Sequence, residues 1–147
     1  MLFRSLAKDG GRGVRALFEV IAADIAAAKA DGDQAGIAAP LEKALGHLQG
    51  STMWLAQHGM ADPNNAGAGA YAYMQLMGLV SLGWMWLKMA GVATKLLAEG
   101  GDDKAFLEAK LTTARFFATR ELVGAGALRG KVEAGADSVM ALPMEAF

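Results

Sequence analysis

The sequence predicts an all-α fold, an up-down bundle of four principal helices with short connections and a short C-terminal tail. Apolar residues recur at helical spacing in four separate segments. Runs that alternate apolar and polar residues, which are typical of strands, are not visible. Alanine, the strongest helix former, is very common. Glycine, aspartate and asparagine separate the segments, and these residues commonly end one helix and begin the next.

The chain has 147 residues, of which 54% are hydrophobic and 20% are charged. This length supports one domain with a real core rather than two domains, and the composition excludes intrinsic disorder. We expect residues 1–11 to form a lead-in segment that ends at Gly10 and Gly11. Residues 12–147 are then a single helical bundle domain.

The first helix is expected over about residues 12–30. Its apolar stripe consists of Val14, Leu17, Phe18, Ile21 and Ile25. Asp31, Gly32 and Asp33 follow as a stop signal, because glycine suits the left-handed position just after a helix.

The second helix is expected to begin between residues 34 and 40, since Pro40 is accepted in a first turn, and to end near Gly59. Its apolar residues are Leu41, Ala44, Leu45, Leu48, Leu55 and Ala56. Gly46 and Gly50 lie four residues apart on one face of this helix. Each glycine costs about 1 kcal/mol against alanine, so we expect a neighbouring helix to approach closely there.

The third helix is expected over about residues 66–99, after Asp62 as a cap and Pro63 at the first helical position. One apolar stripe consists of Leu76, Met77, Val80, Trp84 and Leu87. The opposite stripe consists of Leu79, Leu82, Met85, Trp86 and Met89. A helix that is apolar all round is buried on all sides. Because three helices rarely cover a fourth completely, we expect a second copy or more polypeptide to cover this one.

The longest apolar run of the third helix covers residues 76–87 and stops at Lys88. A membrane span needs about 20 residues. We therefore expect a buried core helix and no transmembrane segment.

The fourth helix is expected over about residues 104–134, with Asp102 and Asp103 as caps at its start. Its predicted buried side consists of Phe106, Leu107, Leu111, Ala114, Phe117 and Ala118. Gly124, Gly126 and Gly130 weaken its last half. Residues 137–147 then form the tail, with one helical turn and an extended end.

Charge and composition exclude several classes of function. The formal net charge of −1 and the pI of about 6.1 argue against nucleic-acid binding, which needs a basic excess. The absence of cysteine excludes disulfides, thiolate zinc sites, iron–sulfur clusters and cysteine nucleophiles. His47 and His58 lie about 16 Å apart along one helix, too far for one metal ion. The carboxylates lie near helix ends and are interpreted as caps, so we predict no catalytic, cofactor-binding or metal-binding residue.

Methionines and tryptophans form an adaptable apolar surface. They are Met53, Trp54, Met60, Met74, Met77, Trp84, Met85, Trp86 and Met89. Ordinary core and partner binding are the two interpretations of this pattern. For partner binding, the predicted interface is Trp84, Met85, Trp86 and Met89, because these four residues span both stripes of the third helix.

Four blocks of sequence carry a resemblance to a known family. They are residues 52–59 (TMWLAQHG), 70–84 (AYAYMQLMGLVSLGW), 106–117 (FLEAKLTTARFF) and 134–142 (AGADSVMAL). In order and spacing they resemble the extra C-terminal helical region of a bacterial acyl-CoA dehydrogenase group that includes the 3-methylmercaptopropionyl-CoA dehydrogenases. The resemblance covers nearly the whole chain, from about residue 9 to residue 147. Relatives often carry a proline near residues 122–124, and this sequence has none there, which argues against a kink at that point.

The resemblance implies that the chain is the C-terminal domain of a larger FAD flavoenzyme. Such an enzyme removes hydrogens from Cα and Cβ of an acyl-CoA thioester: a glutamate takes the α-proton and the flavin N5 takes the β-hydride. The electrons then pass to an electron-transfer flavoprotein. The base and most flavin contacts lie upstream of this region, so we expect FAD in the parent enzyme and none in this chain.

The favoured hypothesis is a structural or oligomerisation role. The domain packs on the catalytic domains of the parent dehydrogenase or across a homodimer, in the cytoplasm. Two alternatives stay open: a free-standing helical protein-interaction module, and a peripheral membrane attachment domain that uses the methionine and tryptophan surface.

Overall fold

The computed structural model describes residues 10–33 and 35–146. Within these residues the chain forms helices and no strand, which confirms the predicted all-α class. The longer helices are α2 (Arg12–Ala30), α3 (Ala38–Ala61), α4 (Pro63–Ala98), α5 (Lys104–Phe116) and α6 (Ala125–Glu133). The shorter ones are the π-helix η1 (Phe117–Glu121) and the 3-10 helices η2 (Leu122–Gly124) and η3 (Met144–Ala146). Of the lead-in expected over residues 1–11, all but the last two residues lie outside the described part.

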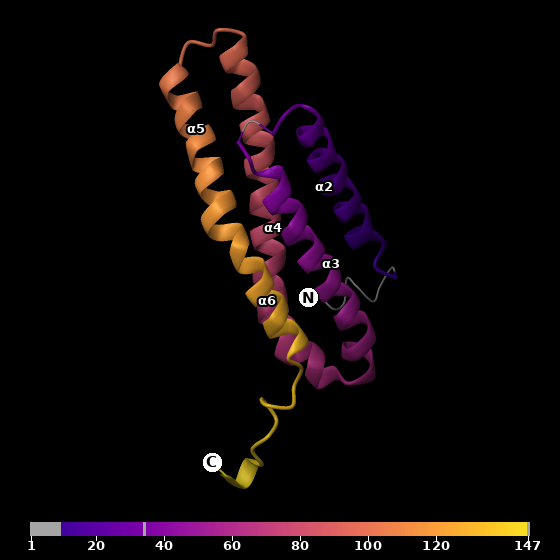
Figure 1. The fold of residues 1–147 in the computed structure, drawn as a ribbon. Coiled ribbons are helices and arrows are strands. Elements are labelled where there is room, and N and C mark those ends of the chain that lie inside the picture. The colour runs from indigo at the N-terminus through magenta and orange to yellow at the C-terminus, as the bar shows by residue number, and fades with distance from the viewer. Residues whose placement is uncertain (1–9, 34, 147) are drawn as a thin grey trace.

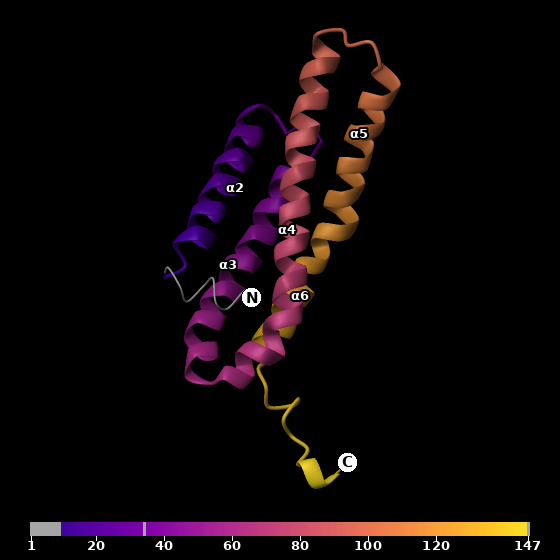
Figure 2. The same ribbon diagram turned by 180° about the vertical axis from the view of Figure 1, so that it is seen from behind.

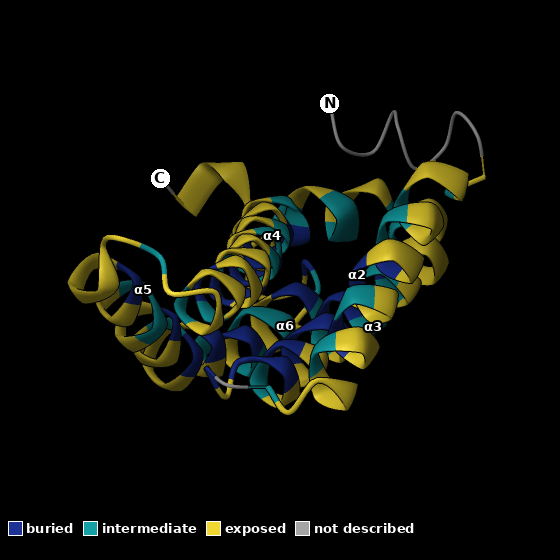
Figure 3. Cartoon of the chain, turned by 90° about the horizontal axis from the view of Figure 1, so that it is seen from above, coloured by how far each residue is buried: buried dark blue, intermediate teal, exposed yellow. Residues whose placement is uncertain are grey.

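Consecutive α-helices run in opposite directions along one long axis (Figure 1). In that view the chain ascends α2, descends α3, ascends α4 and descends α5 and α6. The centre is formed by α3 and α4: α3 packs on α2, α4 and α6, and α4 packs on α3, α5 and α6. Seen from above, α2 and α5 lie on opposite sides of α4 (Figure 3). One long side of α4 is therefore left without a helix from the described part of the chain.

Aspartate side chains accept hydrogen bonds at the starts of three helices, and the sequence predicts this for Asp62 and Asp103. Asp62 accepts a hydrogen bond from the Asn64 backbone N–H at 2.9 Å, with proline as the first helical residue of α4. Asp103 accepts from the Phe106 N–H at 3.2 Å and begins α5. The carboxylate of Asp33 accepts from the first backbone N–H groups around the start of α3, at 3.0 and 2.9 Å. Each of these bonds satisfies an N–H that the helix itself leaves unpaired.

The fourth expected helix is not continuous. It divides into α5 and α6, and η1 and η2 lie between them without any proline. The hydroxyl of Thr119 donates to the Arg115 carbonyl at 2.9 Å and to the Phe116 carbonyl at 3.3 Å. A hydroxyl bonded to these carbonyls competes with the backbone N–H groups that close a regular α-helix. Gly124 ends η2 and Gly126 lies in the first turn of α6, and both lower helix propensity further.

The hydrophobic core lies between α2, α3, α4 and α6. Its largest fully buried side chains are Ile21, Ile25, Ile37, Leu41, Leu48, Tyr73, Leu76, Val80 and Val132. The hydroxyls of Tyr73 and Thr52 form a hydrogen bond of 2.7 Å. Burial raises the pKa of the Tyr73 phenol, because a phenolate loses its hydration there, while the bond to Thr52 opposes the shift.

Glycines allow close packing at particular levels of the bundle. A Cβ on Gly50 would lie 2.8 Å from the guanidinium carbon of Arg129, which is the end of a long side chain, so this contact does not show the predicted close approach of a helix. The prediction is wrong for Gly46, where a Cβ would have no neighbour within 4 Å. A Cβ on Gly83 would lie 2.9 Å from a methyl group of Leu122 and from one of Leu41. Gly83 thus lets α4 approach both α3 and η2.

Candidate interaction surface

The side of α4 that no helix covers carries a continuous row of exposed residues. We define it as the α4 stripe: Tyr71, Gln75, Gly78, Leu82, Met85, Met89, Val92 and Leu96. At 100° per residue these positions fall within an arc of about 100° on the helix surface. The exposed fraction of its large apolar side chains ranges from 38% at Met89 to 67% at Tyr71. Scattered apolar residues are normal on a surface, but a contiguous row marks an interaction site.

The opposite side of α4 explains why the stripe faces outward. Leu76, Val80, Leu87 and Ala90 are buried and belong to the common core. Because α4 is apolar on both sides and has 36 residues, its length and composition alone would allow it to cross a membrane. In the structure this same helix packs on α3, α5 and α6.

A groove between α4 and α5 borders the stripe. It has a volume of about 320 Å³. Its lining is Lys88, Met89, Val92, Ala93, Leu96, Phe106, Leu107 and Lys110. The Lys110 ammonium lies 5.6 Å from the centre of the Trp86 ring and 5.1 Å from that of Phe106. The lining of the groove therefore combines the Phe106 ring with two cations, Lys88 and Lys110.

On the α2 side, polar contacts hold the edge of α4. The indole N–H of Trp84 donates to Asp24 Oδ2 at 2.6 Å, and the Lys88 ammonium donates to the same oxygen at 2.9 Å. These two bonds, that of Lys88 first, lower the pKa of the Asp24 carboxyl, and they outweigh its partial desolvation. The Lys88 ammonium also lies 5.3 Å from the Trp84 ring centre. Trp84 is thus fixed against α2.

The four residues predicted for the interface occupy three different places. Met85 and Met89 are exposed and belong to the α4 stripe. Trp84 is half-buried against α2, and Trp86 is half-buried towards α5, with its ring centre 6.3 Å from that of Phe117. The two tryptophans therefore lie on either side of the α4 stripe, Trp84 towards α2 and Trp86 towards α5, and the two methionines lie between them. A partner at these residues stays a prediction.

Sequence reasoning missed both ends of the surface. Tyr71, Val92 and Leu96 continue the stripe at the same helical spacing, and this spacing was the signal that could have found them. Phe106 was predicted to be buried, and this was wrong: its side chain is 54% exposed. The reason is that α5 packs chiefly on α4, which covers the side of α5 that carries Leu107 and Ala114.

The two histidines of α3 differ in their hydrogen bonding. The Nδ1 atom of His58 lies 3.0 Å from the Trp54 carbonyl oxygen, and its ring stacks on that of Trp54 at 4.6 Å. On α3, His47 Nδ1 and Ser51 Oγ are buried without a hydrogen-bond partner in the described part. The described residues hold no group of three or more histidine and acidic side chains that could bind a metal ion.

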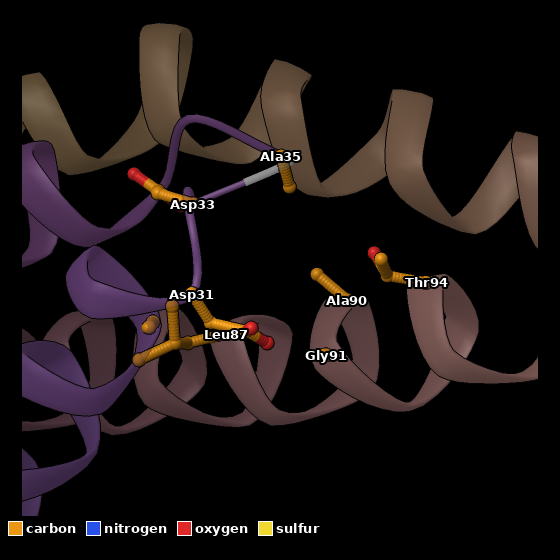
Figure 4. A pocket seen from close by; sticks show the side chains of 8 residues that line it. Asp31, Asp33, Ala35, Leu87, Ala90, Gly91 and Thr94 are labelled. Atoms are coloured by element: carbon orange, nitrogen blue, oxygen red, sulfur yellow. The ribbon is translucent and has the colours of Figure 1, made fainter. Parts of the chain in front are cut away.

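A second, smaller pocket lies where the connection between α2 and α3 meets α4 (Figure 4). It is lined by Asp31, Asp33 and Thr94 together with apolar residues, and its volume is about 50 Å³. This space suits a few water molecules rather than a substrate. The carboxylate of Asp33 is occupied by its two bonds to the start of α3.

Comparison with known proteins gives a consistent result. Residues 17–143 match the family described as acetyl-CoA dehydrogenase C-terminal like. A 3-methylmercaptopropionyl-CoA dehydrogenase of Ruegeria pomeroyi is 34% identical over 141 residues, which cover 95% of this chain and 24% of that protein. The broad-specificity linear acyl-CoA dehydrogenase FadE5 of Mycobacterium tuberculosis is 30% identical over 115 residues, 73% of this chain and 19% of that protein. The chain thus spans about a quarter of the length of these curated relatives or less.

Proposed function

This chain belongs to the family of acetyl-CoA dehydrogenase C-terminal-like domains, and from that premise we propose that it is the C-terminal helical domain of an FAD-dependent acyl-CoA dehydrogenase. The parent enzyme removes hydrogens from Cα and Cβ of an acyl-CoA thioester and passes the electrons to an electron-transfer flavoprotein. Its flavin and catalytic base belong to the other domains, and the enzyme is cytoplasmic. In this proposal α5 and α6 together form the fourth member of an up-down bundle, and the alternating helix directions support that description.

The role proposed for this chain is structural. The observation that carries it is the α4 stripe, an apolar surface that the described part of the chain leaves open. In the parent enzyme, this surface becomes buried when the domain takes its place in the assembly. The carboxylates of Asp33, Asp62 and Asp103 support a structural role, since each accepts a backbone N–H at the start of a helix.

The first test is the chemistry of the chain alone. After gel filtration the purified chain should carry no flavin absorbance, and it should not reduce an artificial electron acceptor when acyl-CoA thioesters of several lengths are added. The second test adds the dehydrogenase domains of the proposed parent enzyme, expressed separately. They should bind FAD and bind this chain. Stoichiometric flavin on the chain alone would place the cofactor site here and overturn the proposal.

A substitution in the α4 stripe tests whether this surface takes part in assembly. Leu82→Glu places a charge in the middle of the exposed apolar row and should weaken assembly, whereas Thr112→Glu on the outer side of α5 should not. Both variants should keep the helical circular dichroism of the parent sequence. If vesicles bind the chain in a co-sedimentation assay and the dehydrogenase domains do not, the membrane attachment hypothesis replaces the proposal.

A further inference from the structure

The α4 stripe follows a strict seven-residue repeat. From Tyr71 to Leu96 its spacing alternates between four and three residues. A repeat of this kind is the seam of a coiled coil, in which the side chains of one helix pack between those of another helix. The stripe is therefore shaped for a helix of similar length.

We propose that the α4 stripe pairs with the α4 stripe of a second copy of this chain, antiparallel, about a twofold axis that crosses the helix between Gly83 and Trp84. The inference deepens the proposed structural role, and it depends on that role only for placing the pair inside a dehydrogenase. A twofold pair is closed, because the same surface is buried in both copies and none remains for further association.

The residues near the axis favour the antiparallel arrangement. Positions at equal distances from the axis face each other, so Leu82 packs on the partner's Met85 and Gly78 lies opposite the partner's Met89. A Cβ on Gly78 would have no neighbour within 4 Å in the single chain, so this position leaves space on the outer surface of the helix. A long, flexible methionine side chain fills such a gap. A parallel pair would instead place Gly78 opposite itself and leave the gap empty.

The ends of the stripe also suit this arrangement. Tyr71 faces the partner's Leu96, and Gln75 faces the partner's Val92. In the single chain the Gln75 amide donates to the Tyr71 hydroxyl at 3.1 Å, so these two polar groups bond to each other at the rim. The arrangement thus has an apolar centre and a polar rim at both ends, which is the usual anatomy of a protein interface.

The available surface is large enough for a stable pair. With Met74 and Phe106 at its edges, the exposed apolar side chains of the stripe offer roughly 800 Å², close to the area per partner in stable complexes. Seen from behind the view of Figure 1, α4 lies in front of the other helices along its length (Figure 2). A second helix can therefore lie along it without meeting α2 or α5 first.

The absence of cysteine makes a direct test possible. Single-cysteine variants of the full chain are treated with a short bis-maleimide, and linked dimers are counted on a denaturing gel. Met85→Cys lies near the axis and should crosslink efficiently to itself. Tyr71→Cys and Leu96→Cys lie about 37 Å apart along the helix. Each should fail to crosslink alone, and a mixture of the two should crosslink. Thr112→Cys, exposed on α5, measures random collisions.

Each outcome has a clear meaning. Efficient self-crosslinking of Tyr71→Cys would show a parallel pair and overturn the proposal. Crosslinking of Met85→Cys at only the Thr112→Cys level, together with a monomeric mass by light scattering at high concentration, would also overturn it. Leu82→Glu provides the second readout, because it should shift the mass from dimer to monomer with its helical circular dichroism unchanged. Flavin content plays no part in these measurements, so the pairing and the dehydrogenase assignment can fail independently.

Discussion

Gly83 packs closely against two buried leucines, and adding one methyl group there measures how closely α4 packs. In Gly83→Ala the new Cβ would lie 2.9 Å from methyl groups of Leu41 and Leu122, both of which are buried. Real Cβ atoms essentially never approach other atoms so closely, so the backbones must separate or the leucines must leave their rotamers. Overpacking of this kind costs about 1–3 kcal/mol. Alanine also raises helix propensity by about 1 kcal/mol over glycine, which offsets part of the cost.

Gly91→Ala is the matched control, because it lies in the same helix, where a Cβ would have no neighbour within 4 Å. It should gain about 1 kcal/mol in unfolding free energy from propensity alone. The difference between the two variants therefore isolates the overpacking, about 1–3 kcal/mol in favour of Gly91→Ala. Urea unfolding followed by circular dichroism, at one protein concentration, measures it. Equal stability of the two variants would refute the close packing of α4 on α3 and η2.

Three further outcomes follow from particular hydrogen bonds. Tyr73→Phe removes the buried bond to Thr52 and should lower the unfolding free energy by about 1 kcal/mol, as measured in urea. Asp62→Ala removes the cap of α4 and should cost about 1 kcal/mol, and Asp62→Asn should restore most of the loss. The pKa of Asp24 is lowered in the folded state, so its contribution is present at neutral pH and is lost as pH falls through the ordinary aspartate range and below. The stability difference between the wild type and Asp24→Asn, at most about 1 kcal/mol for such a partly exposed group, should therefore vanish in acid.

Helix boundaries were predictable where a side chain acts on its own neighbours. Asp62, Asp103 and the glycine at residue 32 belong to local signals, and the structure places helix ends at all three. The break between α5 and α6 was not predictable in the same way. The Thr119 hydroxyl bonds to a carbonyl four residues earlier, and Thr112 and Thr113 do the same inside the regular helix α5, so a threonine in the sequence does not mark the break.

The sequence predicts which face of a helix packs against its neighbours, but not the position along the helix at which a neighbour makes contact. Gly46 and Gly50 share a face of α3, yet only Gly50 meets a neighbour, the Arg129 side chain from α6. The level at which α6 crosses α3 depends on the break before it, which the spacing of apolar residues does not record. For the same reason the sequence predicted two apolar sides of α4 but did not show which of them the other helices leave uncovered.

Substitutions of the two tryptophans of α4 should have a different effect from substitutions in the α4 stripe that lies between them. Trp84 is hydrogen-bonded to Asp24, and Trp86 lies against Lys110 and Phe117, so both already belong to the folded chain. Changing either one disturbs the contacts of α4 with α2 or α5 as well as any partner. Met85 and Met89 lie on a helix that these contacts hold in place, and a surface held in place loses little conformational freedom when it binds. Substitutions in the stripe therefore separate assembly from folding, and substitutions of the tryptophans do not.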